Sequence, residues 1–395
     1  MKNSDYILVF GGTGFIGRVL VWTLLKLKRR CIVVSRKTNY EEVNNSFKEI
    51  WGKSSVRFLA NEAKKNNFIV INSIDYSQKK YIPFLLEALF KKNRLNGKIK
   101  TIINVSGNTS GSSKEIESSI LGESKFIISF IQKLIKNGIS PKLIHLSSVA
   151  AKYPFTLKPP YEKAKQESEE MLKQAGVLDY NVYIGYAKGI GEKKMKAVAT
   201  KIWTYLTSSF LMCSLKVSVV DVERLALYFL LLAEGLNMRI TDNQKKCVDV
   251  YISNGTISFG SMIKALLPTE LRRQAMLPSQ KKKFLELIER VKLLIKGVII
   301  ETTNTNDQFL GRMSHFMKLA AGSGYEWFEK KYNNLNFFGL KPNPNHQKVS
   351  INKTIKAIYI NKKLKIPKIY YDKKRELLFI FNEMSQSKII NFISK

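Results

Sequence analysis

Apolar and polar positions in the first half of the chain follow two alternating patterns. Short continuous apolar runs, typical of buried strands, are separated by longer segments in which apolar residues recur at helical spacing. This alternation favours a parallel sheet whose strands are joined by crossover helices. The sequence therefore predicts an α/β fold, a doubly wound parallel sheet of the Rossmann type. The predicted strands are residues 6–10, 31–35, 68–74, 100–105, 142–146 and 181–186, with a short one at 56–59, and the predicted helices are 14–27, 81–90, 118–136 and 161–175.

The pattern becomes less regular after residue 190 and changes character after residue 258. We expect a nucleotide-binding domain of residues 1–257, with substrate-binding segments after residue 187, and a smaller C-terminal extension domain of residues 258–395. A Pro-Asn-Pro-Asn breaker at 342–345 separates helical from strand-like patterns within the extension. The predicted elements are helix 195–210, a strand and helix at 217–233, strand 248–252, a basic amphipathic helix 280–296, a polar linker 302–308, and strands 357–360, 368–371 and 377–381.

A glycine-rich turn follows the first predicted strand and opens the first predicted helix. Gly11 permits a tight turn, Gly14 lets the backbone approach a pyrophosphate, and Gly17 allows close packing of helix on strand. The helix N-terminus offers backbone N–H groups to the anion. The context favours a dinucleotide-binding turn over a turn required by packing alone. The predicted phosphate site comprises Gly11, Thr13, Gly14, Phe15, Ile16 and Gly17.

The second predicted strand ends in Ser35, Arg36 and Lys37, without a carboxylate. An acidic residue there would bind the ribose 2′-hydroxyl of NAD, whereas an arginine accommodates the 2′-phosphate of NADP. The sequence therefore favours NADP(H), with NAD as the alternative cofactor. Asp75, which ends the third strand, has two interpretations of equal weight: a partner for the adenine amine, or a turn-capping residue.

Tyr161 and Lys165 lie four positions apart at the start of a predicted helix, so they share one face. An ammonium group beside a phenol stabilises the phenolate and makes the tyrosine a usable acid or base. Ser148 follows the fifth strand, at the sheet edge where ligands bind in such folds, and its hydroxyl is placed to polarise a substrate carbonyl. These three residues are the predicted catalytic set.

With these motifs, residues 5–255 resemble the short-chain dehydrogenase/reductase superfamily, in particular its extended or atypical branch of NAD(P)-dependent epimerase/dehydratase-like proteins. The resemblance implies that Tyr161 is the catalytic acid/base, Lys165 its modulator and Ser148 the carbonyl partner. It also implies that Ser106 and Gly107, after the fourth strand, line the cofactor. The segment after the sixth strand lacks the proline that sugar-nucleotide epimerases and dehydratases of this family usually carry there.

Two functional hypotheses follow. The first is an NADP(H)-dependent oxidoreductase or epimerase that moves a hydride between nicotinamide and a carbonyl or hydroxyl carbon of an anionic small molecule, for example a nucleotide sugar. Homodimerisation is expected at the level of the family. The second is a non-catalytic, NADPH-binding accessory subunit or membrane-associated protein similar to the dehydrogenase-like subunit of respiratory complex I.

The formal net charge of +35 has three interpretations. It suits an anionic substrate or cofactor, contact with an anionic membrane surface or nucleic acid, or compositional drift toward lysine and asparagine. No nucleic-acid-binding motif accompanies the lysines, so we expect no nucleic-acid partner. The three cysteines and three histidines show no metal-ligand spacing, so no metal is expected. Without a signal peptide or a long apolar run, we expect a cytoplasmic protein, with peripheral membrane contact as an alternative.

Overall fold

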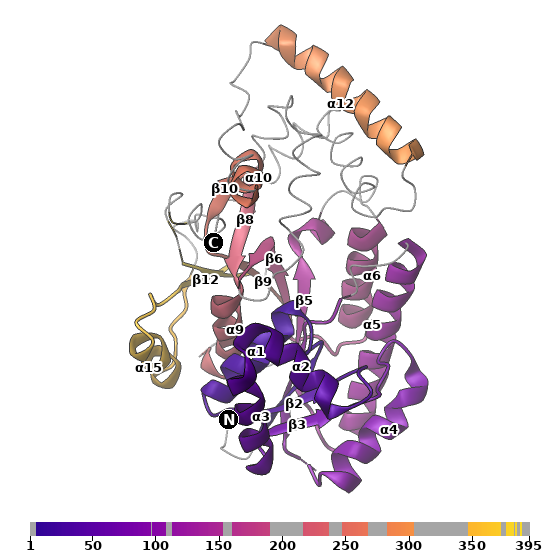
Figure 1. The fold of residues 1–395 in the computed structure, drawn as a ribbon, viewed down its shortest axis with the longest axis vertical. Coiled ribbons are helices and arrows are strands. Elements are labelled where there is room, and N and C mark those ends of the chain that lie inside the picture. The colour runs from indigo at the N-terminus through magenta and orange to yellow at the C-terminus, as the bar shows by residue number, and fades with distance from the viewer. Residues whose placement is uncertain are drawn as a thin grey trace.

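A ten-stranded sheet forms the centre of the computed structural model (Figure 1). The structure describes residues 5–95, 97–107, 113–152, 160–189, 216–236, 247–267, 283–303, 347–372 and 377–382, together with 384 and 388. In sheet order the strands are β11 (Gln347–Lys348), β12 (Lys368–Asp372), β13 (Leu377–Phe381), β9 (Val248–Ser253), β6 (Tyr180–Ile184), β5 (Lys142–Ser148), β4 (Ile99–Asn104), β1 (Tyr6–Phe10), β2 (Arg30–Val34) and β3 (Phe68–Ile71). From β13 to β3 all neighbouring pairs are parallel, whereas β11 and β12 are antiparallel additions at one edge.

Helices cover both faces of this sheet, which is why its central strands are almost entirely apolar. All five residues of β1 are buried. One face packs against α1 (Phe15–Lys26), α2 (Tyr40–Trp51), α3 (Lys53–Lys64), α9 (Val222–Leu230) and α15 (Lys353–Asn361). The other packs against α4 (Ile82–Glu87), α5 (Ser113–Lys136) and α6 (Pro160–Gln174), and the last two lie side by side (Figure 1). Short helical turns are η1 (Lys79–Tyr81), η2 (Ala88–Lys92), η3 (Val149–Lys152) and η5 (Leu231–Gly235).

A small second sheet follows β6 in the chain. Its strands are β7 (Tyr186–Lys188), β8 (Lys216–Asp221) and β10 (Thr256–Ser258), with β8 parallel to β7 and antiparallel to β10. Helix α10 (Phe259–Leu266) continues from β10, and α12 (Lys283–Thr303) lies at one end of the molecule, apart from the main sheet (Figure 1). Among the described helices, none has the length and apolar character that crossing a bilayer requires.

The described residues of the C-terminal extension from 347 onward join the main sheet. Strand β13 pairs in parallel with β9, and the rings of Phe379 and Tyr251 stack across this junction at 5.9 Å. Helix α15 packs beside α9 through Ile355 and Tyr359, both of which are buried in the same core cluster. The extension therefore completes the hydrophobic core around β9.

The predicted doubly wound parallel sheet is confirmed, and so are the strands predicted at 368–371 and 377–381. Two strand predictions are wrong. Residues 56–59 belong to α3, and residues 357–360 belong to α15. The buried residues recur at helical spacing in both helices, as Ser55, Leu59 and Glu62 in α3 and as Ile355 and Tyr359 in α15. Leu59, Ile355 and Tyr359 pack in the core against the sheet, so burial on one helix face decides the outcome over local strand propensity. The predicted helix 195–210, the breaker at 342–345 and residues 304–308 of the predicted linker lie outside the described residues.

Candidate active site

The glycine turn lies between β1 and α1, directly against the end of β4. Gly11 has a φ of +78°, and a Cβ placed on it would lie 2.7 Å from the backbone nitrogen of Ser106. A Cβ on Gly17 would collide with the backbone of Gly11. The Gly14 N–H donates to the Gly11 carbonyl at 3.0 Å and closes the turn. Glycine is therefore required at Gly11 by its conformation and by space, and at Gly17 by space alone.

The start of α1 meets the chemical requirements of a phosphate site. Gly14 is the N-cap, and its helix end carries no side-chain cap. Gly14 is exposed, and Thr13, Phe15 and Ile16 are half-buried. First-turn N–H groups that no side chain caps are the donors that bind a pyrophosphate in folds of this kind. The turn thus fits a dinucleotide on the evidence of its own backbone.

Tyr161 and Lys165 converge on Gly107 at the carboxyl end of β4. A Cβ placed on the exposed Gly107 would lie 3.3 Å from Lys165 Nζ and 4.0 Å from the Tyr161 hydroxyl. Lys165 is buried, and its ammonium donates to the backbone carbonyls of Ser106 at 3.3 Å and Leu146 at 3.4 Å. The two polar groups therefore flank one point beside the glycine turn, as predicted from their spacing.

Three further contacts fix the helix that carries this pair. Glu169, one turn beyond Lys165 on α6, accepts hydrogen bonds from the Ser147 hydroxyl of β5 and, at 2.7 Å, from the Tyr183 hydroxyl of β6. Ser168 shares a 2.6 Å hydrogen bond with Ser124 of α5. Ser148, the predicted third catalytic residue, is the last residue of β5 and is half-buried. Ser148 thus directly follows Ser147, the β5 residue that Glu169 of α6 contacts.

A row of buried, hydrogen-bonded polar side chains lies beneath Tyr161 and Lys165. The Ser106 hydroxyl lies 2.5 Å from Asn104 Oδ1 and 2.7 Å from Glu123 Oε2, and Asn104 Nδ2 lies 3.0 Å from His145 Nδ1. Burial raises the pKa of Glu123, against the opposing effects of the Ser106 hydrogen bond and the charge of Lys165. Burial, together with the charge of Lys165, holds the pKa of His145 well below its usual range.

The sequence predicted Ser106 as a cofactor-binding residue and did not predict these buried hydrogen bonds. The structure turns the Ser106 hydroxyl inward to Asn104 and Glu123, and leaves the neighbouring Gly107 exposed. The available signal was the presence of Asn104 and His145 within otherwise apolar strands, and of Glu123 among apolar positions of α5. Buried polar residues of this kind require partners, and only the fold identifies them.

Arg36 lies where the second strand leaves the sheet. It is exposed, and its guanidinium carbon lies 5.4 Å from the centroid of the Tyr76 ring. Lys37 instead donates to the Glu42 carbonyl at 3.0 Å. Of the two predicted basic residues, the structure thus leaves Arg36 at the surface and uses Lys37 to hold α2.

Asp75 caps the turn after β3. Its carboxylate accepts from the backbone N–H and hydroxyl of Ser77, at 3.1 and 2.7 Å, and from Gln78 at 2.5 Å. Partial burial disfavours its ionisation, but these hydrogen bonds and the charge of Arg36 outweigh that effect and hold the pKa of Asp75 below its usual range. The structure shows the capping hydrogen bonds of Asp75, and its contact with an adenine amine stays a prediction.

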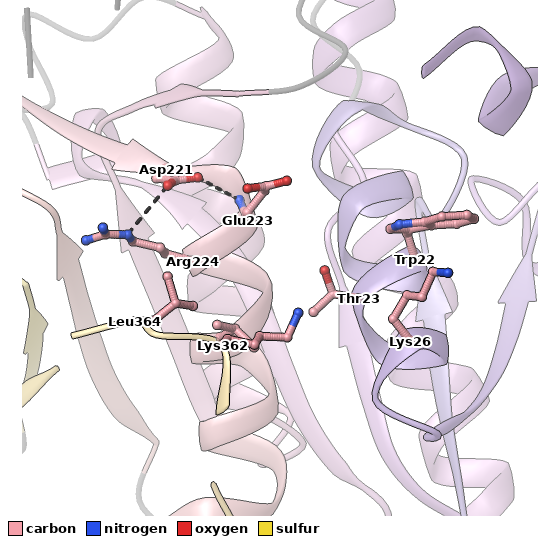
Figure 2. Close-up of a pocket in the computed structure, with 9 residues that line it drawn as sticks. Trp22, Thr23, Lys26, Asp221, Glu223, Arg224, Lys362 and Leu364 are labelled. Carbon is pink, nitrogen blue, oxygen red and sulfur yellow. Dashed lines mark hydrogen bonds and ion pairs between the residues drawn. The ribbon is translucent and has the colours of Figure 1, made fainter. Parts of the chain in front are cut away.

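A separate cavity of about 310 Å³ lies between the second half of α1, the start of α9 and the segment after α15 (Figure 2). Asp221 pairs with Arg224 at 3.5 Å and caps α9 by accepting from the Glu223 N–H. The cavity is lined by Trp22, Thr23, Lys26, Asp221, Glu223, Arg224, Leu227, Lys362 and Leu364. None of the predicted site residues lines it, so it is distinct from the Tyr161–Lys165 site.

Within the described ranges, no group of histidine, cysteine or acidic residues is arranged to hold a metal ion. Cys31 and Cys247 are free thiols, and burial raises the pKa of Cys247 to about 12. Both cysteines are therefore poor nucleophiles at neutral pH. Among the described residues, the candidate reactive groups are therefore those around Tyr161 and Lys165.

Residues 7–201 match the family described as NAD dependent epimerase/dehydratase family. A comparison with curated proteins gives no match. The aureusimine biosynthetic cluster reductase domain aligns at 13% identity and a TM-score of 0.48, over 80% of this chain and 90% of that one. The Bordetella bronchiseptica enzyme WbmH, solved with NAD+, aligns at 12% and 0.45, over 70% and 84%. Yeast methylglyoxal/isovaleraldehyde reductase Gre2, solved with NADPH, aligns at 15% and 0.44, over 66% and 81%. Such low identities and TM-scores carry no conclusion about activity.

Proposed function

We propose that this protein uses NADP(H) to interconvert a carbonyl and a hydroxyl group on an anionic small molecule. Residues 7–201 belong to the NAD dependent epimerase/dehydratase family, which is an extended short-chain dehydrogenase/reductase type. The protein is therefore an NAD(P)-dependent enzyme of the oxidoreductase/epimerase class. The observation that carries this proposal is the convergence of the Tyr161 hydroxyl and Lys165 ammonium beside Gly107, at the edge where Gly11 approaches Ser106. A purely structural Rossmann domain has no need of a tyrosine and a lysine aimed at one exposed glycine.

The residues would divide the work as follows. When bound, the nicotinamide supplies or accepts the hydride. The Tyr161 hydroxyl gives a proton to the substrate oxygen during reduction and takes it back during oxidation. Lys165, held by two backbone carbonyls, places its positive charge beside the phenolate that remains. Ser148 donates a hydrogen bond to the same substrate oxygen and orients it.

Arg36 supports the preference for NADP(H). It is the exposed cation at the end of β2, and its position over Tyr76 holds the guanidinium at the sheet edge. A guanidinium binds a phosphate through charge-assisted hydrogen bonds, which an adenosine ribose without a 2′-phosphate does not offer.

The net charge of +35 supports an anionic substrate, because a positive field raises the local concentration of anions. A phosphorylated or nucleotide-linked carbonyl compound meets this requirement. The substrate would lie between the carboxyl edge of β5 and the segment that begins at β7.

The test is a paired measurement on Tyr161→Phe. The wild-type protein is assayed for NADPH oxidation against a panel of carbonyl compounds and nucleotide sugars, and cofactor affinity is measured by nicotinamide fluorescence. We expect Tyr161→Phe to lower turnover by about a hundredfold or more while NADPH affinity stays nearly unchanged. Tyr81→Phe, a half-buried tyrosine on η1, is the matched control and retains turnover. Turnover that survives in Tyr161→Phe contradicts the assignment.

A further inference from the structure

Exposed apolar side chains concentrate on one helix of the described chain. Six of the nine large hydrophobic side chains that are exposed among the described residues lie on α12. They are Ile288, Val291, Leu294, Ile295, Val298 and Ile299, each between 40% and 54% exposed. Isolated exposed apolar residues need no explanation, whereas a contiguous set marks an interaction surface.

The spacing of these six residues places them on one side of α12, because they recur at intervals of three and four positions. We call this set the α12 stripe. Glu289 and Leu293 project from the opposite side of the helix and are buried. The helix therefore has one buried face and, on the opposite side, a partly exposed apolar face, the α12 stripe.

Lysines border the α12 stripe on one side, and the other border carries Arg290 together with the acidic Glu301. On a helical projection at 100° per residue, Lys292 and Lys296 fall along one border and Arg290 along the other. Lys292 is exposed, and Arg290 and Lys296 are half-buried. An apolar stripe flanked by lysines is found on helices that lie in the interface of anionic membranes.

We propose that α12 docks the protein on an anionic membrane surface, with the α12 stripe inserted among the lipids and Arg290, Lys292 and Lys296 against the headgroups. The formal net charge of +35 adds a long-range attraction to such a surface. The helix would lie in the plane of the interface, since no described helix is suited to crossing the bilayer. Its place at one end of the molecule leaves the Rossmann sheet outside the membrane (Figure 1).

A second copy of this protein fits the α12 stripe less well than an anionic membrane does. In a two-fold symmetric dimer with antiparallel helices each surface meets its own copy, so Lys292 and Lys296 of one stripe would face the same lysines of the other. Like charges brought together in this way oppose association. Anionic lipid supplies the opposite sign to these lysines.

The test is co-sedimentation of the full chain with phosphatidylcholine vesicles, with and without phosphatidylserine. We expect binding that requires phosphatidylserine and weakens as salt is raised. Val291→Gln combined with Ile295→Gln should lower the affinity at least about tenfold, because two apolar side chains no longer leave water. Lys292→Gln with Lys296→Gln should lower it by roughly tenfold for phosphatidylserine vesicles.

The matched control is Phe84→Gln with Ile360→Gln, which removes two apolar side chains that are 61% and 58% exposed on α4 and α15. This variant should bind vesicles as the wild type does, and circular dichroism melting should show all variants folded. Absence of phosphatidylserine-dependent binding overturns the proposal, and so does binding that Val291→Gln with Ile295→Gln leaves unchanged. Self-association in sedimentation velocity that this variant abolishes, without vesicle binding, identifies a second copy as the occupant and also overturns it.

Discussion

The Ser106 hydroxyl lies between two buried acceptors, 2.7 Å from Glu123 Oε2 and 2.5 Å from Asn104 Oδ1. Asn104 Oδ1 accepts the Ser106 backbone N–H at 3.1 Å, so the amide orientation is fixed and the same oxygen is an acceptor for the Ser106 hydroxyl proton. A hydroxyl has a single proton to donate, so Asn104 Oδ1 and Glu123 Oε2 compete for the proton of Ser106. A protonated Glu123 would end this competition by donating to Ser106, and burial, which raises the pKa of Glu123, favours that form.

Glu123→Gln should leave the fold intact and make its stability less dependent on pH, because an amide also donates to Ser106. A carboxyl group whose pKa is raised by folding adds to the free energy of unfolding. This contribution is complete at pH values below its pKa in the unfolded chain, about 4.3, and is lost as the pH rises through its pKa in the folded protein. Above that window the variant should therefore be more stable than the wild type, by on the order of 1 kcal/mol. Urea unfolding at several pH values measures this difference.

The control for this measurement is Glu87→Gln, which changes an exposed carboxylate on α4. It should show no such gain in stability at alkaline pH. A Glu123→Gln variant whose stability follows the wild-type pH profile throughout would show that Glu123 is ionised in the folded protein.

His145 should lower the stability of the folded protein as the pH falls, which is opposite to the pH dependence expected for Glu123. Asn104 Nδ2 donates to Nδ1, so the neutral ring carries its proton on Nε2. Because burial and Lys165 lower the pKa of His145, its contribution to stability is lost as the pH falls below about 6.5, at no more than about 1.4 kcal/mol per pH unit. His145→Gln keeps an acceptor for Asn104 and should flatten the pH profile between 6.5 and the folded pKa. Identical slopes in the two proteins would contradict a buried neutral histidine.

Gly11→Ala should cost more stability than its backbone conformation alone explains. Gly11 and Gly138 both have a positive φ, +78° and +74°, which costs an alanine roughly 1–2 kcal/mol. A Cβ on Gly138 meets nothing within 4 Å, whereas one on Gly11 lies 2.7 Å from the Ser106 nitrogen. Gly11→Ala should therefore unfold at lower urea than Gly138→Ala and should also lose NADPH binding. Equal stability and intact binding would exclude the close approach of Gly11 to β4.

Arg36→Gln should weaken NADPH binding by about tenfold and leave NADH binding nearly unchanged, since only NADPH carries the 2′-phosphate. Nicotinamide fluorescence titrations with both cofactors give the two affinities. Arg57→Gln, an exposed arginine of α3, is the control for loss of one positive charge. A parallel loss of affinity for both cofactors would indicate that Arg36 supports the fold around Tyr76 and does not select the cofactor.

The local motifs of this protein were predictable from sequence because each depends on neighbouring residues. The glycine turn needs its glycines at fixed intervals after a strand, and Tyr161 and Lys165 share a helix face through their spacing alone. The alternation of strand and helix patterns likewise determines the parallel sheet, since crossover helices must cover both of its faces.

The tertiary structure alone decided the contacts between distant segments. Glu123 meets Ser106 because α5 packs beneath the end of β4, and Glu169 meets Tyr183 because α6 packs on β6. Strand β13 lies beside β9 although more than a hundred residues separate them, and α15 is helical where its isoleucines suggested a strand. Such outcomes depend on which faces find apolar partners when the whole chain folds, and local propensity is too weak to determine them.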